Sequence, residues 1–515
     1  MTLAAPSRAA VLVRRIGLLG GPAAALLLYF SLPTEFLDAA GKAVPFGHAG
    51  RATLAMMAWM ALWWMTEAVE IEVTALLPIV AFPLFGIMKL GATTANYGAD
   101  VIFLFLGGFI LALAIQRWGL DRRIAFLTLK AVGTKPGGII AGCMGATAFM
   151  SMWISNTATA AMMVPIALSV IDLVLVRRTG RTLAQAGGIP REDRDHRNFA
   201  MALLLCIAYA ASIGGVGTLI GSPPNLILAR FMSQTYGVEI GFARWMIIGL
   251  PTALIFLPLA WVVITKVVLP TRIGEIEGGA AWVESEYAKL GPLNRGERAT
   301  LAVFGATVLL WLFRPLLAAI EIGGVRPLAG LSDAGIAVGA ALALFMFPVD
   351  RVKGTFASDW ATAVKLPWGV LILFGGGLAL AAATEANGVA AFIGSLAKDL
   401  GGWPVLAVVL GVVALTTFMS ELTSNTAQVA TMLPIMAALA PALGVPPAIL
   451  LVPVTMAASL AFMMPVGTPP NAIVFGTGLV TIPDMIRAGV WLNLAGILLN
   501  TALAFLLIAP LVGAR

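Results

Sequence analysis

Two long apolar runs in this chain each contain the tripeptide Ser-Asn-Thr. The first copy, Ser155–Thr157, lies within residues 137–175, and the second, Ser424–Thr426, lies within residues 405–443. The same spacing of 269 residues (155 to 424) relates Ser151 to Ser420, Pro165 to Pro434, Gly107 to Gly376 and Ala112 to Ala381. One offset that joins scattered polar, glycine and proline positions indicates an internal duplication with the tripeptide at the heart of each half.

The composition is that of a membrane protein. Hydrophobic residues make up 60% of the chain and charged residues 11%, whereas a soluble globular protein carries roughly 25% charged residues. Many apolar runs exceed the roughly 20 residues that span a bilayer. The net charge of +7 is therefore better explained by cytoplasmic loops, where Lys and Arg collect, than by a nucleic-acid partner. We expect an all-α polytopic membrane protein.

The candidate spans follow one another with short polar connections. Arg8, Arg14 and Arg15 precede an apolar run that ends near Leu32, which we interpret as an uncleaved anchor with a cytoplasmic N-terminus in an inner membrane of bacterial type. Beyond the two motif runs, the expected spans are 52–66, 73–90, 100–117, 199–230, 244–269, 299–317, 333–348, 367–384, 447–478 and 488–511.

Positive charge predicts how the two motif runs enter the membrane. Basic segments flank the first run on both sides, so a single crossing would leave one of them outside the cytoplasm. A re-entrant helical hairpin with Ser-Asn-Thr at its tip avoids this conflict. The second run has only Lys398 nearby before it and no basic residue after it until Arg487, so we expect it to enter from the opposite face. The two halves are then inverted repeats that meet near the membrane midplane.

The residues at these tips suit ion binding. A hairpin tip leaves free carbonyl groups at one helix end, which attract cations, and free N–H groups at the other, which attract anions. Ser and Thr hydroxyls and the Asn amide add both donors and acceptors. A second pair of motifs, Gly221–Asn225 and Gly467–Asn471, contains two adjacent prolines each and predicts an unwound point in a transmembrane helix.

Enzyme chemistry is not expected. The two cysteines, Cys143 and Cys206, lie within apolar runs, and the two histidines, His48 and His196, lie in polar connections without a metal-ligand partner at suitable spacing. No nucleophile–base pair or metal cluster occurs within the spans, so no catalytic residue is predicted.

With these motifs in place, the chain resembles the divalent anion/sodium symporter (DASS) family, which transports di- and tricarboxylates. The resemblance covers most of the chain. It rests on both Ser-Asn-Thr motifs, both Gly-(Ser/Thr)-Pro-Pro-Asn motifs, and the segments Trp63–Ala68, Leu366–Gly369 and Phe374–Gly377. It implies about eleven transmembrane helices plus two hairpins, a homodimer, and a transport domain that slides against a scaffold like an elevator. The scaffold would be 1–120 and 244–390, and the transport domain 138–230 and 403–515.

The same resemblance implies a set of binding residues. Sodium ligands would be Ser151, Ser155, Asn156 and Gly221 at one site and Ser420, Ser424, Asn425 and Gly467 at the other. The substrate carboxylates would meet Asn156, Thr157, Asn425, Thr426, Thr468 and Pro469. Since this set contains no Lys or Arg, bound Na⁺ must supply the positive charge that compensates the anion.

We therefore expect Na⁺ as coupling ion and the symport of C4-dicarboxylates such as succinate, malate or fumarate. Two alternatives share the fold, namely a sodium-independent dicarboxylate exchanger and a carrier of sulfate or another divalent anion. An ion channel lined by the same carbonyl groups is an alternative of a different class.

Overall fold

The computed structural model describes residues 8–37, 42–186, 188–189, 193–276, 278–396 and 402–508. The outermost residues of the expected scaffold and transport segments, 1–7 and 509–515, lie outside the described residues. The described chain is almost entirely helical, which confirms the expected fold class. It also contains two short antiparallel hairpins, β1 (Glu35–Leu37) with β2 (Ala43–Pro45), and β3 (Pro348–Asp350) with β4 (Thr355–Phe356).

The helices follow the apolar runs of the sequence. The first part of the chain forms α1 (Arg8–Ser31), α2 (His48–Thr66), α3 (Ile71–Thr74), α4 (Leu77–Leu84), α5 (Leu90–Ala95), η1 (Asn96–Gly98), α6 (Asp100–Trp118), α7 (Leu120–Val132), α8 (Pro136–Ser151), α9 (Asn156–Thr179), α10 (Leu183–Ala186), α11 (Arg194–Val216) and α12 (Pro223–Tyr236). The remainder forms α13 (Phe242–Val262), η2 (Val263–Val268), α14 (Gly279–Lys289), α15 (Arg295–Ala318), α16 (Asp333–Met346), α17 (Trp360–Ala363), α18 (Trp368–Ala386), α19 (Val389–Leu396), α20 (Val405–Ser420), α21 (Asn425–Ala442), α22 (Ala448–Ala458), α23 (Pro469–Phe475), α24 (Ile482–Leu503) and η4 (Ala504–Ile508). Among the described helices, eight are long and apolar enough to cross a membrane.

One expected span is shorter in the structure, where the apolar helical stretch runs only from Ile71 to Leu84. Residues 73–90 do not form a single helix, because α3 ends at Thr74 and α4 begins at Leu77 and stops at Leu84. Pro78 accounts for the break, since it has no N–H to donate and its ring would clash with the carbonyl group of Thr74 in a continuous helix.

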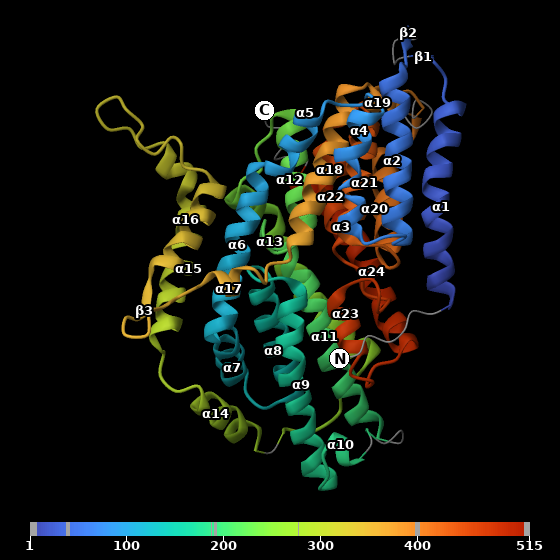
Figure 1. Cartoon of the computed structure of the whole chain (residues 1–515). Coiled ribbons are helices and arrows are strands. Elements are labelled where there is room, and N and C mark those ends of the chain that lie inside the picture. The colour runs from blue at the N-terminus through green and yellow to red at the C-terminus, as the bar shows by residue number, and fades with distance from the viewer. Residues whose placement is uncertain are drawn as a thin grey trace.

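Each motif run forms two helices joined by a short turn at the Ser-Asn-Thr tripeptide, and the re-entrant course predicted for these hairpins stays a prediction. The chain reverses at residues 152–155 between α8 and α9, and at residues 421–424 between α20 and α21. In Figure 1 the first hairpin lies in the lower half of the molecule and the second in the upper half. The two double-proline motifs also break their helices as predicted, at residues 217–222 between α11 and α12 and at residues 459–468 between α22 and α23.

Packing between these elements repeats across the two halves. In the first half α8 and α9 both pack against α11, and in the second half α20 and α21 both pack against α22. The two halves also pack against each other: α9 of the first half contacts α23 of the second, and α21 of the second half contacts α12 of the first. These contacts of one half thus have counterparts in the other, and each hairpin packs against the broken helix of the opposite half.

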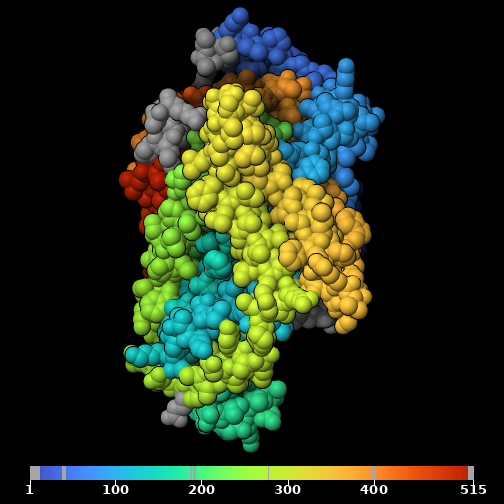
Figure 2. Space-filling view, turned by 90° about the vertical axis from the view of Figure 1, so that its left-hand side faces the viewer, coloured from blue at the N-terminus to red at the C-terminus, as the bar shows by residue number. Residues whose placement is uncertain are grey.

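Burial differs sharply between the helices. The apolar window of α11 is 100% buried, so this helix forms the centre of the bundle, whereas that of α15 is only 11% buried. Helices α15 and α16 stand out from the body on one side and form a ridge along the face seen in Figure 2. The ridge leaves large apolar side chains uncovered, among them Leu309, Phe313, Leu316, Leu342 and Met346. In a membrane protein such a surface faces lipid or a second copy of the chain.

Candidate functional site

The Ser-Asn-Thr tripeptides begin the second helix of each hairpin. Ser155 is the N-cap residue of α9, and its hydroxyl accepts a hydrogen bond from Ala158 N at 3.3 Å. Ser424 occupies the equivalent position before α21. The first turn of a helix leaves backbone N–H groups without intrahelical partners, and the N-terminus carries partial positive charge. Both tips therefore present donors where the resemblance predicts an anion.

Three oxygens and one amide converge at the first tip. The Ser151 hydroxyl, which is fully buried, donates to the Ala211 carbonyl oxygen at 2.7 Å. One polar atom of the Asn156 amide lies 2.6 Å from Ser151 Oγ, 3.1 Å from the Ala211 carbonyl oxygen and 3.2 Å from the Gly221 carbonyl oxygen. The hairpin, α11 and the unwound segment after α11 each contribute to this cluster.

The chemistry of this cluster fits a sodium ion. If the Asn156 NH₂ faces the three oxygens, its two N–H groups can donate to Ser151 Oγ and the Gly221 carbonyl oxygen while the Ser151 hydroxyl donates to the Ala211 carbonyl oxygen, and the cluster is satisfied without a cation. If the amide is turned so that Oδ1 faces them, the single Ser151 proton can be donated either to Oδ1 at 2.6 Å or to the Ala211 carbonyl oxygen at 2.7 Å, and a cation would compensate the oxygens left without a donor. The same side chain can therefore serve both states by rotating its amide.

Glycine is required where the cluster meets the unwound segment. A Cβ atom at Gly221 would lie 2.6 Å from the Gly215 carbonyl oxygen and 3.0 Å from the Ser151 carbonyl oxygen. A Cβ atom at Gly215 would lie 2.5 Å from Asn156 Oδ1. Any other residue would push the backbone away from the Asn156 amide, so these glycines allow the carbonyl groups to approach it.

The structure brings together Ser151, Asn156 and Gly221, but it uses Ser155 differently. The Ser155 hydroxyl caps α9 and makes no hydrogen bond to the other three within the described residues. Capping occupies one lone pair of the hydroxyl oxygen, and a second lone pair is still free.

The second tip is not a copy of the first. The Ser420 hydroxyl donates to the Thr417 carbonyl oxygen of its own helix at 2.7 Å, instead of reaching across to the broken helix. The Asn425 Oδ1 atom is buried without a hydrogen-bond partner. Across the described ranges, no hydrogen bond joins Ser420, Ser424, Asn425 and Gly467 to one another. A buried, unpartnered amide oxygen is an orphan acceptor that a cation would satisfy.

A carboxylate occupies this second tip. Glu421, which is only 4% exposed, accepts hydrogen bonds from three consecutive backbone N–H groups in the unwound segment after α22. These come from Phe462 at 2.7 Å, Met463 at 3.0 Å and Met464 at 2.9 Å. The Asn493 amide of α24 adds a fourth donor at 2.7 Å. Those backbone donors are therefore taken by the protein itself and are not free to bind a substrate carboxylate.

Two asparagines clamp the unwound segments in the same way. The Asn225 amide donates to the carbonyl oxygens of Gly215 at 3.0 Å and Thr218 at 2.8 Å. The Asn471 amide donates to those of Ala461 at 3.2 Å and Met464 at 3.0 Å. In both repeats the acceptors are the residues ten and seven positions before the asparagine. This shared geometry is the strongest structural evidence for the duplication.

The predicted substrate residues lie at the ends of helices that pack together. Asn156 and Thr157 begin α9, which contacts α23, and α23 begins at Pro469 directly after Thr468. Asn425 and Thr426 begin α21, which contacts α12. Thr157 and Pro469 are exposed, whereas Thr468 is buried and caps α23 through Asn471 N at 3.4 Å. A hydroxyl contact of 3.3 Å between Ser222 and Ser459 links the two broken helices.

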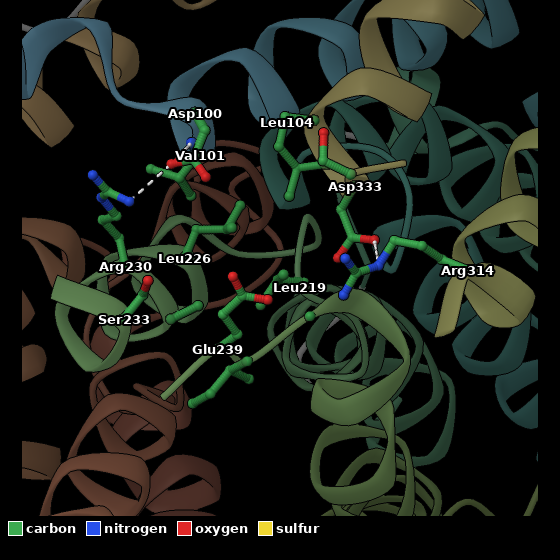
Figure 3. A pocket seen from close by; sticks show the side chains of 15 residues that line it. Asp100, Val101, Leu104, Leu219, Leu226, Arg230, Ser233, Glu239, Arg314 and Asp333 are labelled. Carbon is green, nitrogen blue, oxygen red and sulfur yellow. Dashed lines mark hydrogen bonds and ion pairs between the residues drawn. The ribbon is translucent and has the colours of Figure 1, made fainter. Parts of the chain in front are cut away.

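A pocket of about 120 Å³ lies beside the first broken helix (Figure 3). It contains two ion pairs, Asp100–Arg230 at 3.0 Å between α6 and α12, and Arg314–Asp333 at 2.8 Å between α15 and α16. The Glu239 carboxylate points into the space between them. With two cationic and three anionic side chains, this pocket does not suit a dianion, and we do not assign it to substrate.

Comparison with known proteins decides the family. The model of the sodium:sulfate symporter transmembrane region matches residues 44–513. The chain belongs to this family. It is 40% identical over 465 residues to the sodium-dependent dicarboxylate transporter SdcS of Staphylococcus saprophyticus, covering 90% of this chain and 87% of that protein. It is 39% identical over 481 residues to SdcS of Staphylococcus aureus, covering 93% of this chain and 88% of that protein.

Two solved transporter structures share the fold. The Alcanivorax borkumensis YdaH transporter aligns with a TM-score of 0.56 at 14% identity, covering 96% of this chain and 98% of that one. Neisseria gonorrhoeae MtrF, described as one of a class of antimetabolite efflux pumps, aligns with a TM-score of 0.55 at 13% identity, covering 98% and 96%. Membership of a symporter family confirms two predictions, a multi-pass membrane protein and not an enzyme.

Sequence reasoning missed three residues of this site. Asn225 and Asn471 belong to motifs whose prolines predict the helix breaks, but the local sequence gives the asparagine no role. Glu421 lies in the apolar run 405–443, and an ionisable residue inside such a run is by itself a signal of function.

Proposed function

We propose that this chain is a sodium-coupled transporter that carries C4-dicarboxylates such as succinate, malate or fumarate across a bacterial inner membrane. The names of its SdcS relatives support both the sodium dependence and the substrate class. The observation that carries the proposal is the cluster of Ser151, Asn156, Ala211 and Gly221, because its oxygens suit a hard cation and no cationic side chain lies among them.

Coupling follows from this distribution of charge. A dianion between the helix N-termini of α9 and α21 gains partial positive charge from the helix ends, but its site contains no Lys or Arg. Sodium ions bound beneath the tips would supply the missing charge. By linkage, an anion that binds tightly only after Na⁺ also tightens the binding of Na⁺, and the two cross the membrane together.

The decisive experiment is uptake of radiolabelled succinate into proteoliposomes with and without a Na⁺ gradient. We expect saturable uptake that requires Na⁺ and that malate and fumarate compete for. Counterflow in sodium-free buffer would instead favour the exchanger, and inhibition by sulfate alone would favour the sulfate carrier. Uptake that does not saturate and shows no counterflow would favour the channel.

We further propose that the two halves are inverted in the membrane, with a cytoplasmic N-terminus. The asymmetry of Lys and Arg around the two hairpins supports this orientation. A cysteine at Lys135 or Arg181, both exposed, should react only with reagents admitted to the cytoplasm, whereas one at Leu443 should react from outside. Labelling of all three from the same side would contradict the inverted arrangement.

The threonine hydroxyls at the tips should bind the dicarboxylate, and the serine hydroxyls should bind Na⁺. Thr157→Ala or Thr426→Ala should raise the apparent KM for succinate, because these side chains face the anion in our proposal. Ser151→Ala should weaken apparent Na⁺ affinity first, and Ser420→Ala less so, since its hydroxyl already bonds within α20. One neutral hydrogen bond is worth about 0.5–1.5 kcal/mol, or roughly 2- to 12-fold in affinity. Equal losses of both affinities in all four variants would contradict this division.

A homodimer and a sliding transport domain complete the proposal. The apolar ridge of α15 and α16 supports a surface that lipid and a second copy cover together. The segments 138–230 and 403–515 would move as one body against 1–120 and 244–390. The contacts between the two repeats, α9 with α23 and α21 with α12, support a single moving unit.

A further inference from the structure

The buried carboxylate of Glu421 has no cationic partner among the described residues. Its contacts are with N–H donors, namely the backbone of Phe462, Met463 and Met464 and the side chain of Asn493. An ionised carboxylate only accepts hydrogen bonds, so a shell made of donors suits the charged form. Successive backbone N–H groups that converge on one point form an anion-binding nest, and here the anion belongs to the protein.

The first repeat lacks this charge. At the spacing of 269 residues, Glu421 corresponds to Met152. There the Thr218 hydroxyl, in the unwound segment after α11, donates to the Met152 backbone carbonyl oxygen. A neutral hydrogen bond thus joins tip to broken helix in the first half, whereas a carboxylate does so in the second.

The charge lies next to the second predicted sodium site. A Cβ atom built on Gly467 would stand 3.0 Å from Glu421 Oε2, which places the carboxylate beside that residue's backbone. The orphan Oδ1 of Asn425 belongs to the same tip, four residues after Glu421. Between unit charges at short range, attraction in a buried environment is several times stronger than in water.

We propose that Glu421 is the positioning residue of the second sodium site. Its carboxylate holds the unwound segment 459–468 against the hairpin tip, and its negative charge raises the affinity of this site above that of the first. The inference rests on the proposed sodium coupling and goes beyond it, because it makes the two sites unequal. The second site fills at the lower Na⁺ concentration, and the first fills afterwards.

The test replaces Glu421 by Gln and measures two constants separately. Glu421→Gln keeps the size of the side chain, removes the charge, and turns an NH₂ toward N–H donors. We expect the Na⁺ concentration for half-maximal uptake to rise about 10-fold or more, because one buried charge interaction is lost. The apparent KM for succinate at saturating Na⁺ should change less than about 3-fold.

Two further variants make the outcome decisive. Asn493→Ala keeps the charge and removes one donor, so it should raise the half-maximal Na⁺ concentration in the same direction by about 2- to 5-fold. Glu385→Gln makes the same change at an exposed glutamate near the end of α18 and should leave both constants as in the wild type. If Glu421→Gln does not fold, Asn493→Ala alone decides. Sodium-dependent thermal stabilisation of the purified protein provides a readout that is independent of transport.

The possible failures are distinguishable. Wild-type uptake that is indifferent to Na⁺ would overturn the proposed function itself. Wild-type uptake that requires Na⁺, together with an unchanged half-maximal concentration in Glu421→Gln, would overturn the role of Glu421 alone. A merely structural role would lower the maximal rate, or weaken both ligands equally, without a selective loss of Na⁺ affinity.

Discussion

Replacing Asn471 by Asp should reduce transport per folded molecule by at least about 30-fold. The Asn471 amide is fully buried and donates to the carbonyl oxygens of Ala461 and Met464, both within the unwound segment 459–468. Aspartate has nearly the same shape, but it offers these carbonyls an oxygen in place of a donor. Each buried group left unsatisfied costs about 1–3 kcal/mol, so losing both bonds costs about 2–6 kcal/mol.

The same change at Asn225 should have a similar effect, because its amide makes the equivalent pair of bonds in the first repeat. The unwound segments also contain Gly221 and Gly467, which the resemblance assigns to sodium. If an unwound segment loses these two hydrogen bonds, its backbone is no longer held in place. The predicted sodium ligand in that segment, Gly221 or Gly467, would then leave its position as well. Uptake of succinate, normalised to the protein that elutes as a single species in size-exclusion chromatography, measures the effect.

Asn198→Asp is the matched control. Asn198 is also buried on α11, and its amide donates to the Pro270 carbonyl oxygen at 3.0 Å, outside the unwound segments. We expect this variant to be less stable to heat but to transport at the normal rate per folded molecule. If Asn471→Asp behaved like Asn198→Asp, the clamp would be a general contribution to stability without a role in the site.

The sequence predicts best those features of the fold that depend on local constraints. Double prolines at 223–224 and 469–470 forbid a continuous helix, and basic loops around the first motif run forbid a single crossing. Both constraints are local; both helix breaks were predicted correctly, and the re-entrant course of the two hairpins stays a prediction. The interruption at residues 75–76 before Pro78 obeys the same rule, but the unbroken apolar run around it predicts one span.

Roles that depend on long-range partners were harder to predict. Ser151 and Ser420 match at one offset, yet one hydroxyl reaches across to α11 and the other bonds within its own helix. Glu421 meets backbone groups about 40 residues away, at Phe462 to Met464, and nothing in the local sequence names that partner. A duplicated motif therefore predicts that two sites exist, but not that they are chemically equal.

Cross-linking α6 to α12 should stop transport almost completely. Asp100 and Arg230 form an ion pair of 3.0 Å that joins the proposed scaffold segment 1–120 to the proposed transport segment 138–230 (Figure 3). If the transport domain slides as a rigid body, this pair must separate in every cycle. We would introduce Asp100→Cys with Arg230→Cys after replacing the two buried native cysteines, Cys143 and Cys206, by Ala. A short bifunctional maleimide would then join the two positions.

The neighbouring ion pair provides a control with the same chemistry in the same pocket. Arg314 and Asp333 lie 2.8 Å apart on α15 and α16, both within the proposed scaffold segment 244–390. Cross-linking Arg314→Cys to Asp333→Cys should leave uptake as it is without the linker, because these helices keep their mutual contacts during the cycle. Sodium and succinate should still stabilise both cross-linked proteins against heat, since neither linker touches the tips. Normal uptake by the protein joined through positions 100 and 230 would exclude sliding at this boundary, and a block by both linkers would place the boundary between α15 and α16 instead.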